Sequence, residues 1–311
     1  MTPGVLIIAG PTASGKTALA IELARQFGAE IIGADSRQIY RGMPVGTAAP
    51  SEAELAAVPH HLVGFLDPSQ RYSAASFVAD ALAAIEEIAS RGKRTIVTGG
   101  TGFYIRALSG DVALAGERDE TLRSRLAHEA QIHPPEVIHA WLEAFDPPRA
   151  KALHAADRYR VLRALEVALA VRQSRPPSTD LARETLKTKN VPFAKVYLDV
   201  AFGELESRIE RRVERMLAAG LLEEAERLGA TAVAADAVGY PQALAYLRGF
   251  STREELRTQL VRATRRYARR QATWFRSEPN VVSITGSDPI AQLVTIARKL
   301  PGWEREFHTP A

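Results

Sequence analysis

The spacing of apolar and polar positions predicts alternating strands and helices in the first third of the chain. Short apolar runs typical of buried parallel strands occupy residues 4–10, 29–36, 60–68 and 93–100. Segments with the apolar spacing of amphipathic helices occupy residues 17–28, 73–92 and 101–110. Strands that alternate with helices in this way indicate a parallel sheet covered on both faces. We therefore expect an α/β fold.

The pattern changes at about Val112 and changes back after Ala156. Between them lie helix-like stretches broken by "HPPE" and "DPPRA", with no strand signal. This predicts a helical insertion domain over residues 112–156. After it come a long helix that begins at Asp157, further helices over 203–229 and 251–276, and strands over 193–200 and 280–286. We expect a core built from residues 1–111 and 157–311.

Composition narrows the class of protein. Hydrophobic residues make up 46% and charged residues 24% of the 311 positions, which is typical of a globular protein. The chain has no cysteine, which excludes disulfides and Cys-ligated zinc. No stretch approaches the roughly 20 apolar residues of a membrane span. The start resembles no signal peptide, so we expect a cytoplasmic protein. The net charge of +4 is mildly basic.

The sequence "GPTASGKT" follows the first predicted strand and precedes a helix. It fits the phosphate-loop pattern and consists of Gly10, Pro11, Thr12, Ala13, Ser14, Gly15, Lys16 and Thr17. Its glycines allow backbone N–H groups to approach phosphate oxygens, and Lys16 adds a positive charge. The Thr17 hydroxyl is the expected Mg²⁺ ligand. We expect a P-loop NTPase-like core that binds a phosphorylated ligand.

The partners that a nucleotide hydrolase needs are missing. The strand over 93–100 ends in Thr98-Gly99-Gly100 and not in the aspartate that holds Mg²⁺ in such enzymes. The nearest suitable carboxylate is Asp35, at the end of the second strand. Parallel sheets bind ligands beyond the carboxyl ends of their strands, where Asp35 and Thr101 both lie. We expect them to share one pocket with the phosphate loop, although each alone has a helix-capping alternative.

The helix over 251–276 is strongly basic. It has eight arginines against two acidic residues, and five of the arginines are spaced to lie along one face: Arg262, Arg265, Arg266, Arg269 and Arg270. Like charges at this spacing destabilise a helix unless an anion neutralises them. The alternatives are a solvated face with local ion pairs and a nucleic-acid backbone, and the one-sided excess favours the backbone.

Two further arginine pairs have the same two interpretations. Arg160 and Arg163 share a helix face, as do Arg208 and Arg212. Surface ion pairs with Glu166, Glu210 and Glu214 are the alternative to ligand binding. His60 and His61 have no third ligand near them in sequence, so we interpret them as structural.

Taken together, the motifs resemble one family along most of the chain. They are "GPTASGKTALA", "ADSRQIYRGMPVGTAAPS", "HHLVGFLDPSQRYSAASF", "TGGTGFYIRAL", "RVLRALEV", "RIERRVERMLAAGLLEE", "AVGYPQAL" and "TRRYARRQATWFR". In this order they resemble the tRNA dimethylallyltransferase family. The resemblance implies transfer of a dimethylallyl group from dimethylallyl diphosphate to N6 of adenosine 37 in the tRNA anticodon stem-loop, with Mg²⁺ as cofactor.

The resemblance also implies roles for individual residues. The loop Gly10–Thr17 would bind the diphosphate, helped by Lys16 and Arg212, while Asp35 accepts the N6 proton and Thr101 hydrogen-bonds near the reacting amine. The residues implied to contact tRNA are Asp35, Ser36, Arg37, Gln38, Thr101, Arg123, Tyr159, Arg160, Val161, Leu162, Arg163, Asp236, Gly239, Tyr240, Arg266 and Arg270. Pro241 stands where the family commonly has a basic residue. We expect a monomer, because one chain can wrap one tRNA.

Three alternatives remain from the sequence. A P-loop kinase acting on a nucleoside or nucleotide with ATP would explain the phosphate loop, but not the missing aspartate or the basic helix. A prenyltransferase acting on free AMP would not need that basic surface. A non-catalytic RNA-binding module would bind RNA with strong salt dependence and form no product.

Overall fold

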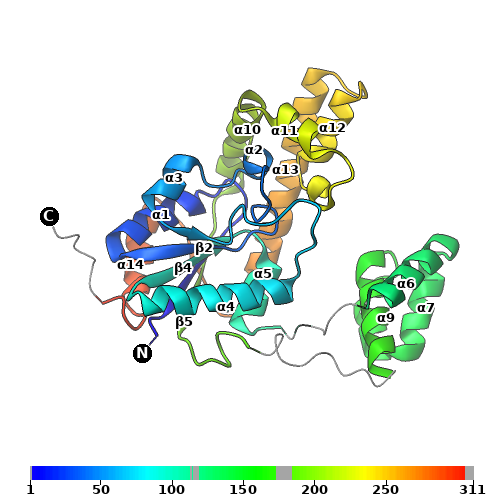
Figure 1. Ribbon diagram of the computed structural model, residues 1–311, viewed down its shortest axis with the longest axis horizontal. Helices are drawn as coiled ribbons and strands as arrows, with labels where there is room; N and C mark the ends of the chain where they lie inside the picture. The colour runs from blue at the N-terminus through cyan, green and yellow to red at the C-terminus, as the bar shows by residue number, and fades with distance from the viewer. Residues whose placement is uncertain (1, 113, 115–118, 173–183, 305–311) are drawn as a thin grey trace. The chain divides into compact units, whose positions relative to one another are not determined.

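The computed structural model describes residues 2–112, 114, 119–172 and 184–304. It divides into two compact units: residues up to Val112 and from Thr185 form the first, and Ala113–Glu184 form the second. We call them the core unit and the helical unit. Figure 1 shows the elements of each. No helix in the described residues is long and apolar enough to cross a membrane.

The core unit contains one parallel sheet of six strands in the order β3-β2-β4-β1-β5-β6. Its strands are β1 (Val5–Ala9), β2 (Ala29–Gly33), β3 (His60–His61), β4 (Arg94–Gly99), β5 (Phe193–Leu198) and β6 (Val281–Ile284). The predicted α/β class is confirmed. β3 is shorter than the predicted run over 60–68, because Leu62 and Gly64 adopt left-handed backbone angles that end the strand.

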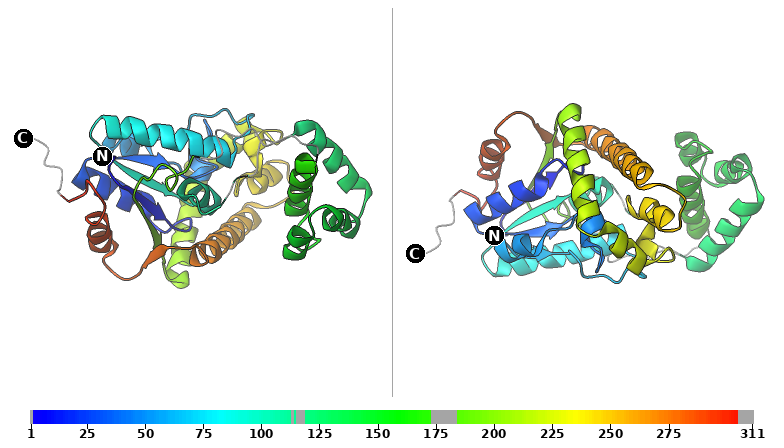
Figure 2. Two further views of the ribbon diagram at one scale, coloured as in Figure 1. Left: turned by 90° about the horizontal axis from the view of Figure 1, so that it is seen from below. Right: turned by 90° about the horizontal axis from the view of Figure 1, so that it is seen from above.

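Helices cover both faces of the sheet (Figures 1 and 2). On one face, α1 (Lys16–Phe27) and α14 (Pro289–Ala297) pack on alternate strand residues such as Leu6 and Ile8. On the other face lie α4 (Ala74–Ser90) and α5 (Gly102–Ser109). Because both faces are covered, every residue of β1 and β2 is buried.

A second helical layer of the core unit has its own apolar cluster. Its helices are α10 (Phe202–Ala218), α11 (Leu221–Leu228), the short 3₁₀ helix η1 (Val233–Asp236), α12 (Tyr240–Leu247) and α13 (Arg253–Arg276). The short helix α2 (Pro44–Thr47) packs against α11, and α3 (Glu52–Ala57) follows α2 in the sequence. Ile39 and Met43 join residues of α10 to α13 in this cluster. The segment after β2 is thereby attached to α10, α11 and α12.

The helical unit consists of α6 (Glu120–Ile132), α7 (Pro135–Phe145), α8 (Pro147–Ala152) and α9 (Arg158–Arg172) around a separate apolar cluster. The sequence predicted that this insertion ends at Ala156. The structure extends it to Glu184. The reason is that Val161 and Leu165 of α9 are buried against α6 and α7, so α9 belongs to the helical unit and not to the core.

The chain leaves and re-enters the core unit at one place. The N–H of Leu186 donates to the carbonyl oxygen of Leu108 at 2.9 Å. Asp111 forms ion pairs with Lys187 and Lys195, and Lys195 also contacts the buried Glu278 at 2.9 Å. Burial alone would raise the pKa of Asp111, but the two lysines lower it to about 2. A charged, hydrogen-bonded cluster thus fixes both ends of the insertion.

Candidate active site

Three strand ends meet at the carboxyl edge of the sheet. Ala9 of β1 lies beside Gly99 of β4, and the N–H of Ala34 donates to the carbonyl oxygen of Thr98 at 2.8 Å. The chain then folds back, so that the N–H of Ser36 donates to Thr101 Oγ1 at 2.9 Å. The structure therefore brings Asp35–Gln38 and Thr101 together beside the phosphate loop, as the sequence predicted.

The phosphate loop has the backbone of an anion-binding turn. Ala13 and Gly15 adopt left-handed angles, with φ of 65° and 89°. Such an angle is rare for alanine, and strain of this kind is concentrated at ligand sites. α1 begins at Lys16, where its first N–H groups have no intrahelical acceptor. The buried Ser14 hydroxyl also has no hydrogen-bond partner among the described residues. These donors are arranged for phosphate oxygens.

Lys16 is the cationic residue of the phosphate loop, and its pKa is lowered. Burial lowers the pKa of its ammonium group to about 8, Asp35 acts to raise it, and Arg212 lowers it further. Its Nζ is 3.4 Å from the carbonyl oxygen of Pro11. A cation held partly desolvated in this way gains strongly from a bound anion.

Arg212 of α10 also belongs to this site. Its Nη2 donates to the carbonyl oxygen of Thr47 at 3.1 Å, while its Nε is buried without a partner. Burial lowers its pKa, and Asp35 opposes that shift. Arg208, one turn earlier, instead pairs with Glu204 at 2.5 Å and donates to the carbonyl oxygen of Ser14 at 2.9 Å. The two predicted arginines therefore have different roles. Arg212 is a cation of the site, whereas Arg208 supports the phosphate loop.

Asp35 has one carboxylate oxygen engaged locally. Its Oδ1 accepts the N–H groups of Arg37 and Gln38 at 2.9 and 3.4 Å, which is a turn of the capping kind. Oδ2 accepts no hydrogen bond from the described residues, so one carboxylate oxygen is available to a ligand. Gln38 points its amide to the carbonyl oxygens of Thr47 and Ala48.

The glycines of "TGGTG" are required by close packing. A Cβ atom at Gly99 would lie 2.0 Å from the carbonyl oxygen of Ala34. At Gly100 it would lie 2.3 Å from Gln271 Nε2, and at Gly102 it would lie 2.1 Å from Trp274. These glycines allow β2 and α13 to approach the end of β4, which explains them without a dinucleotide.

Sequence reasoning missed two buried residues that organise the site. Glu224 of α11 accepts the N–H groups of Val45 and Gly46 at 2.9 and 2.7 Å, and it thereby holds the turn that contacts Arg212. Gln271 of α13 bridges the phosphate loop and Gly100. Glu224 gives no signal in a run of charged residues. Gln271 could have been found from the sequence, because it is a polar residue within the buried stripe of α13 that includes Ala268 and Phe275.

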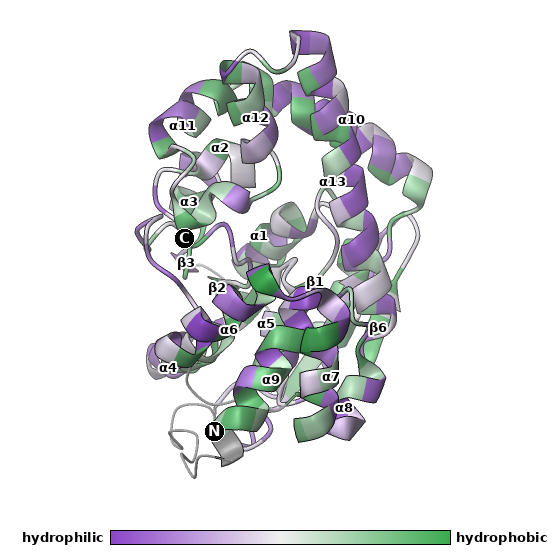
Figure 3. Cartoon of the chain, turned by 90° about the vertical axis from the view of Figure 1, so that its right-hand side faces the viewer, coloured by the Kyte–Doolittle hydropathy of each residue, from purple (hydrophilic) through white to green (hydrophobic). Residues whose placement is uncertain are grey.

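The arginines of α13 divide into two groups. Figure 3 shows the hydrophilic stretches of α10 and α13. Arg265 pairs with Glu210 at 2.6 Å, Arg269 lies 4.0 Å from Glu206, and Arg257 pairs with Glu214. For these, the local ion-pair interpretation describes the structure. Three arginines of the face have no acidic partner within the described residues: Arg262, Arg266 and Arg270.

The segment 236–240 differs from the expectation in one residue. Asp236 forms an ion pair with Arg37 at 2.9 Å, which places it at the end of the Asp35–Gln38 turn. Gly239 has φ of 111° and begins α12. Tyr240 was predicted to contact RNA, but it is fully buried and its hydroxyl donates to Glu224 at 2.8 Å. Its place is therefore beneath the site, as a support for Glu224.

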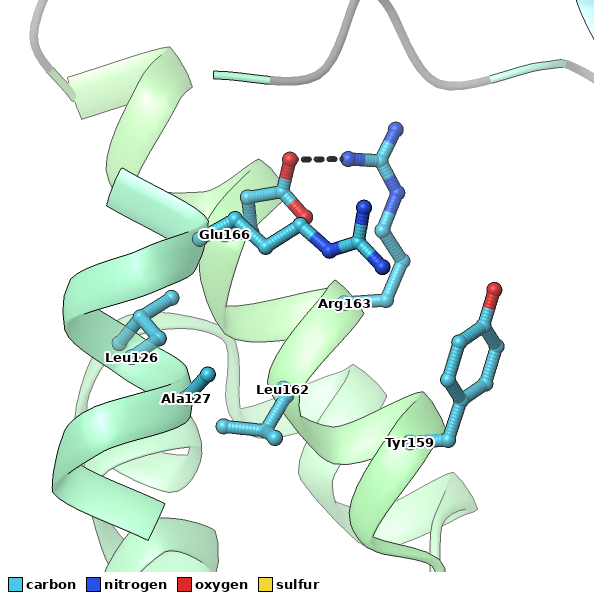
Figure 4. A pocket seen from close by; sticks show the side chains of 7 residues that line it. Leu126, Ala127, Tyr159, Leu162, Arg163 and Glu166 are labelled. Carbon is cyan, nitrogen blue, oxygen red and sulfur yellow. Dashed lines mark hydrogen bonds and ion pairs between the residues drawn. The ribbon is translucent and has the colours of Figure 1, made fainter. Parts of the chain in front are cut away.

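The helical unit has a shallow cavity of about 160 Å³ between α6 and α9 (Figure 4). Leu126, Ala127 and Leu162 form its apolar floor, and Arg163 pairs with Glu166 at 2.5 Å. Arg123 and Tyr159 also line it.

The other predicted RNA contacts of the helical unit lie on α9. Arg160 pairs with Asp157 at 2.8 Å and is exposed. Val161 is buried in the apolar cluster and cannot reach a ligand in this arrangement. Of the predicted segment, the exposed residues Tyr159 and Arg160 and the partly buried Leu162 and Arg163 are accessible.

The residues present fit a magnesium ion bound together with a diphosphate. The described residues hold no cluster of three acidic or histidine side chains, so no all-protein metal cage exists among them. Mg²⁺ is commonly held by one or two protein groups, water and substrate phosphates. The Thr17 hydroxyl has no partner among the described residues and stands at the first turn of α1, which is the donor that such a site requires.

Two family models match the chain. The model described as IPP transferase covers residues 38–278, and the model described as isopentenyl transferase covers residues 3–64. A tRNA dimethylallyltransferase from Anaeromyxobacter dehalogenans is 45% identical over 284 residues, which span 90% of this chain and 94% of that protein. One from Geobacter sulfurreducens is 40% identical over 303 residues, with 96% and 97% covered.

Solved structures are similar over nearly the whole chain. A full-length tRNA isopentenylpyrophosphate transferase from Bacillus halodurans has a TM-score of 0.67 and 34% identity, with 97% of each chain covered. A eukaryotic dimethylallyltransferase captured acting on tRNA has a TM-score of 0.74 and 26% identity, with 95% of this chain and 78% of that one covered.

Proposed function

We propose, because this chain belongs to the tRNA dimethylallyltransferase family, that it transfers a dimethylallyl group from dimethylallyl diphosphate to N6 of adenosine 37 in tRNA. The products are N6-(dimethylallyl)adenosine and diphosphate. The observation that carries this proposal is the meeting of the phosphate loop with Lys16, Arg212, Asp35 and Thr101 at one sheet edge. An anion site thus lies beside a carboxylate and a hydroxyl.

The cations answer the chief difficulty of the reaction. The exocyclic amine of adenine is a weak nucleophile, because its lone pair is delocalised into the ring. The C–O bond of the donor must therefore stretch until C1 is strongly electrophilic, and negative charge builds on the departing diphosphate. Lys16, Arg212 and the loop N–H groups stabilise that charge, and preorganised electrostatic stabilisation of this kind is usually the largest catalytic contribution. Mg²⁺ held at Thr17 would supply further neutralisation of the same charge.

Asp35 and Thr101 act on the amine. As the C–N bond forms, N6 loses a proton, and the free Oδ2 of Asp35 is placed to accept it. Thr101 Oγ1 accepts the Ser36 N–H at 2.9 Å and donates its own proton to Ser36 Oγ at 3.3 Å. We propose that this long hydrogen bond gives way to one from Thr101 to the bound substrate. A positioned general base contributes typically about 10²–10⁴-fold.

The target base must leave the anticodon stack to reach this site. Enzymes that modify a stacked base extrude it into a pocket and pay a few kcal/mol for unstacking. We propose that Asp35–Gln38 and the arginines of α13 that have no acidic partner among the described residues contact the tRNA, and that the accessible side chains of α6 and α9 contact it as well. We further propose that the enzyme acts as a cytoplasmic monomer, since one chain offers all these groups.

Nucleoside mass spectrometry tests the proposal. Unmodified tRNA with adenosines at 36 to 38 is incubated with the protein, Mg²⁺ and dimethylallyl diphosphate, and we expect dimethylallyl adenosine at position 37. A parallel reaction with ATP and no RNA tests the kinase alternative. If tRNA stays unmodified while ATP is consumed, the phosphate loop serves a nucleotide and the proposal fails.

A further inference from the structure

Gln271 is a buried side chain of α13 that joins the two ligand loops of the site. Its Oε1 accepts the N–H of Thr12 in the phosphate loop at 2.9 Å, and its Nε2 donates to the carbonyl oxygen of Gly100 at 2.9 Å. The side chain is 6% exposed. Both ends of the amide are therefore satisfied by protein groups and not by bulk water, and each bond spans more than 170 positions of the chain.

Close packing reinforces this bridge. A Cβ atom at Gly100 would meet Gln271 Nε2 at 2.3 Å, and one at Gly102 would meet Trp274 at 2.1 Å. Arg106 of α5 lies over the Trp274 ring at 4.2 Å. One turn of α13 is thus in direct contact with the loop after β4. Because packed interiors deform in discrete steps and not continuously, α13 and these loops shift together or lose the contacts.

The helix α13 also carries the arginines that we propose to bind the RNA backbone. Arg270 directly precedes Gln271, and Arg266 and Arg262 lie on the same side as Arg270, one and two turns earlier. None of the three has an acidic partner in the described part of the chain. Arg270 also lies over the ring of Tyr267, between them in sequence, at 5.8 Å from the ring centroid. A ligand on the arginine face therefore contacts the same helix that is hydrogen-bonded, through Gln271, to the phosphate loop.

We propose, resting on the proposed function, that Gln271 is a positioning residue that couples RNA binding on α13 to diphosphate binding at the phosphate loop. Each ligand favours the arrangement in which α13, Thr12 and Gly100 are joined. By linkage, each must then raise the affinity of the other by the same factor. The bridge also fixes the separation between the phosphate loop and the loop that carries Thr101, and so between the leaving group and the attacking amine.

The test compares binding of two probes, inorganic pyrophosphate with Mg²⁺ and a synthetic anticodon stem-loop RNA. The dissociation constant of pyrophosphate is measured with and without saturating RNA. For the wild type we expect RNA to tighten pyrophosphate binding about fivefold or more. Gln271→Met keeps the length of the side chain and removes its amide, so the factor should approach one. Gln259→Met, an exposed glutamine of the same helix, is the matched control.

A second readout separates positioning from simple structural damage. In Gln271→Met, the affinity for each probe alone should change by less than about threefold, while the single-turnover rate falls about tenfold or more, because small misplacements of reacting groups are costly. Gln271→Glu keeps an acceptor for Thr12 and loses the donor to Gly100, so its coupling factor should also fall. It supplies the comparison if thermal denaturation shows that the methionine variant is unfolded.

Each outcome decides the inference. An undiminished coupling factor in the folded Gln271 variants overturns it, as does a wild type that binds both probes without coupling. In that second case the proposed function stands. A wild type that binds neither probe overturns the proposed function and this inference together.

Discussion

Among single residues, the site holds two of the buried polar atoms that have no hydrogen-bond partner in the described part of the chain. Ser14 Oγ and Arg212 Nε are buried without partners, whereas Arg208, one turn from Arg212, is fully engaged. Buried polar groups in native proteins nearly always have a hydrogen-bond partner. Of the exceptions among the described residues, these two lie at the phosphate loop, where ligand oxygens would complete their hydrogen bonds.

Asp35→Asn should separate catalysis from binding. The asparagine Oδ1 still accepts the N–H groups of Arg37 and Gln38, so the turn persists, but the side chain no longer accepts a proton. We expect single-turnover prenylation to fall by about 10²-fold or more, with tRNA affinity unchanged. Rapid-quench kinetics and filter binding measure the two quantities.

Asp67→Asn is the matched control for this substitution. Asp67 Oδ1 accepts the N–H of Ser69 at 2.9 Å in a similar exposed turn, away from the phosphate loop. It should leave the rate unchanged. Full activity in Asp35→Asn would remove Asp35 from the mechanism.

Lys16 should make diphosphate binding depend on pH. Burial lowers the pKa of its ammonium group to about 8 in the free protein, and a bound anion raises that pKa by favouring the charged form. Lys16 is therefore charged in both states below the free-state pKa. Above it, binding requires uptake of a proton, so pyrophosphate affinity should fall by about tenfold per pH unit until the pKa of the bound state is reached. Calorimetric titration across this range measures the fall.

Lys16→Arg supplies the comparison, because arginine stays charged throughout. Any remaining pH dependence in that variant belongs to the titration of pyrophosphate itself. If the inflection near 8 persists in Lys16→Arg, it does not arise from Lys16.

At the level of the element, α13 should bind RNA through one part of its basic face only. Arg266 and Arg270 have no acidic partner among the described residues, so alanine at both positions removes two phosphate contacts. We expect the slope of log K against log salt to decrease by roughly 1.4–1.8, at 0.7–0.9 per contact. Fluorescence anisotropy at several salt concentrations measures the slope.

Arg257 of the same helix provides the internal control. It is already paired with Glu214, so Arg257→Ala should leave the slope unchanged. An equal change of slope in both variants would show that overall charge, and not the position of the arginines on α13, governs RNA binding.

The elements also show what sequence can predict. Local patterns predicted the strands, the helices and the polar residues that follow strands, because each of these signals lies within a few residues. Two hydrogen bonds of the site join distant segments. The bond between Gln271 and Thr12 spans 259 positions, and the bond between Glu224 and Gly46 spans 178. Such contacts leave no local pattern. The placement of α9 was missed for the same reason, since its apolar side suits either unit and only packing against α6 and α7 decides.

For the whole molecule, the important feature is that each unit has its own apolar cluster and that the insertion begins and ends at one point. The contact between Leu108 and Leu186 and the ion pairs of Asp111 belong entirely to the core unit. The fold of the phosphate loop and of its supports Gln271 and Glu224 therefore rests on core residues alone.

Replacing residues 113–184 by a short Gly/Ser linker should leave the anion site intact. The two ends are already adjacent, so the linker need not strain the core. We expect pyrophosphate affinity to stay within about twofold, because distant, independent sites contribute additively. We expect tRNA affinity to fall by about tenfold or more, because the basic side chains of α6 and α9 are lost.

Leu142→Ala in the full chain tests the same division without a deletion. Leu142 is fully buried in the helical unit, and its truncation should cost that unit about 2–5 kcal/mol. Loss of pyrophosphate binding in both variants would show that the core needs the helical unit to fold, contrary to the separate clusters.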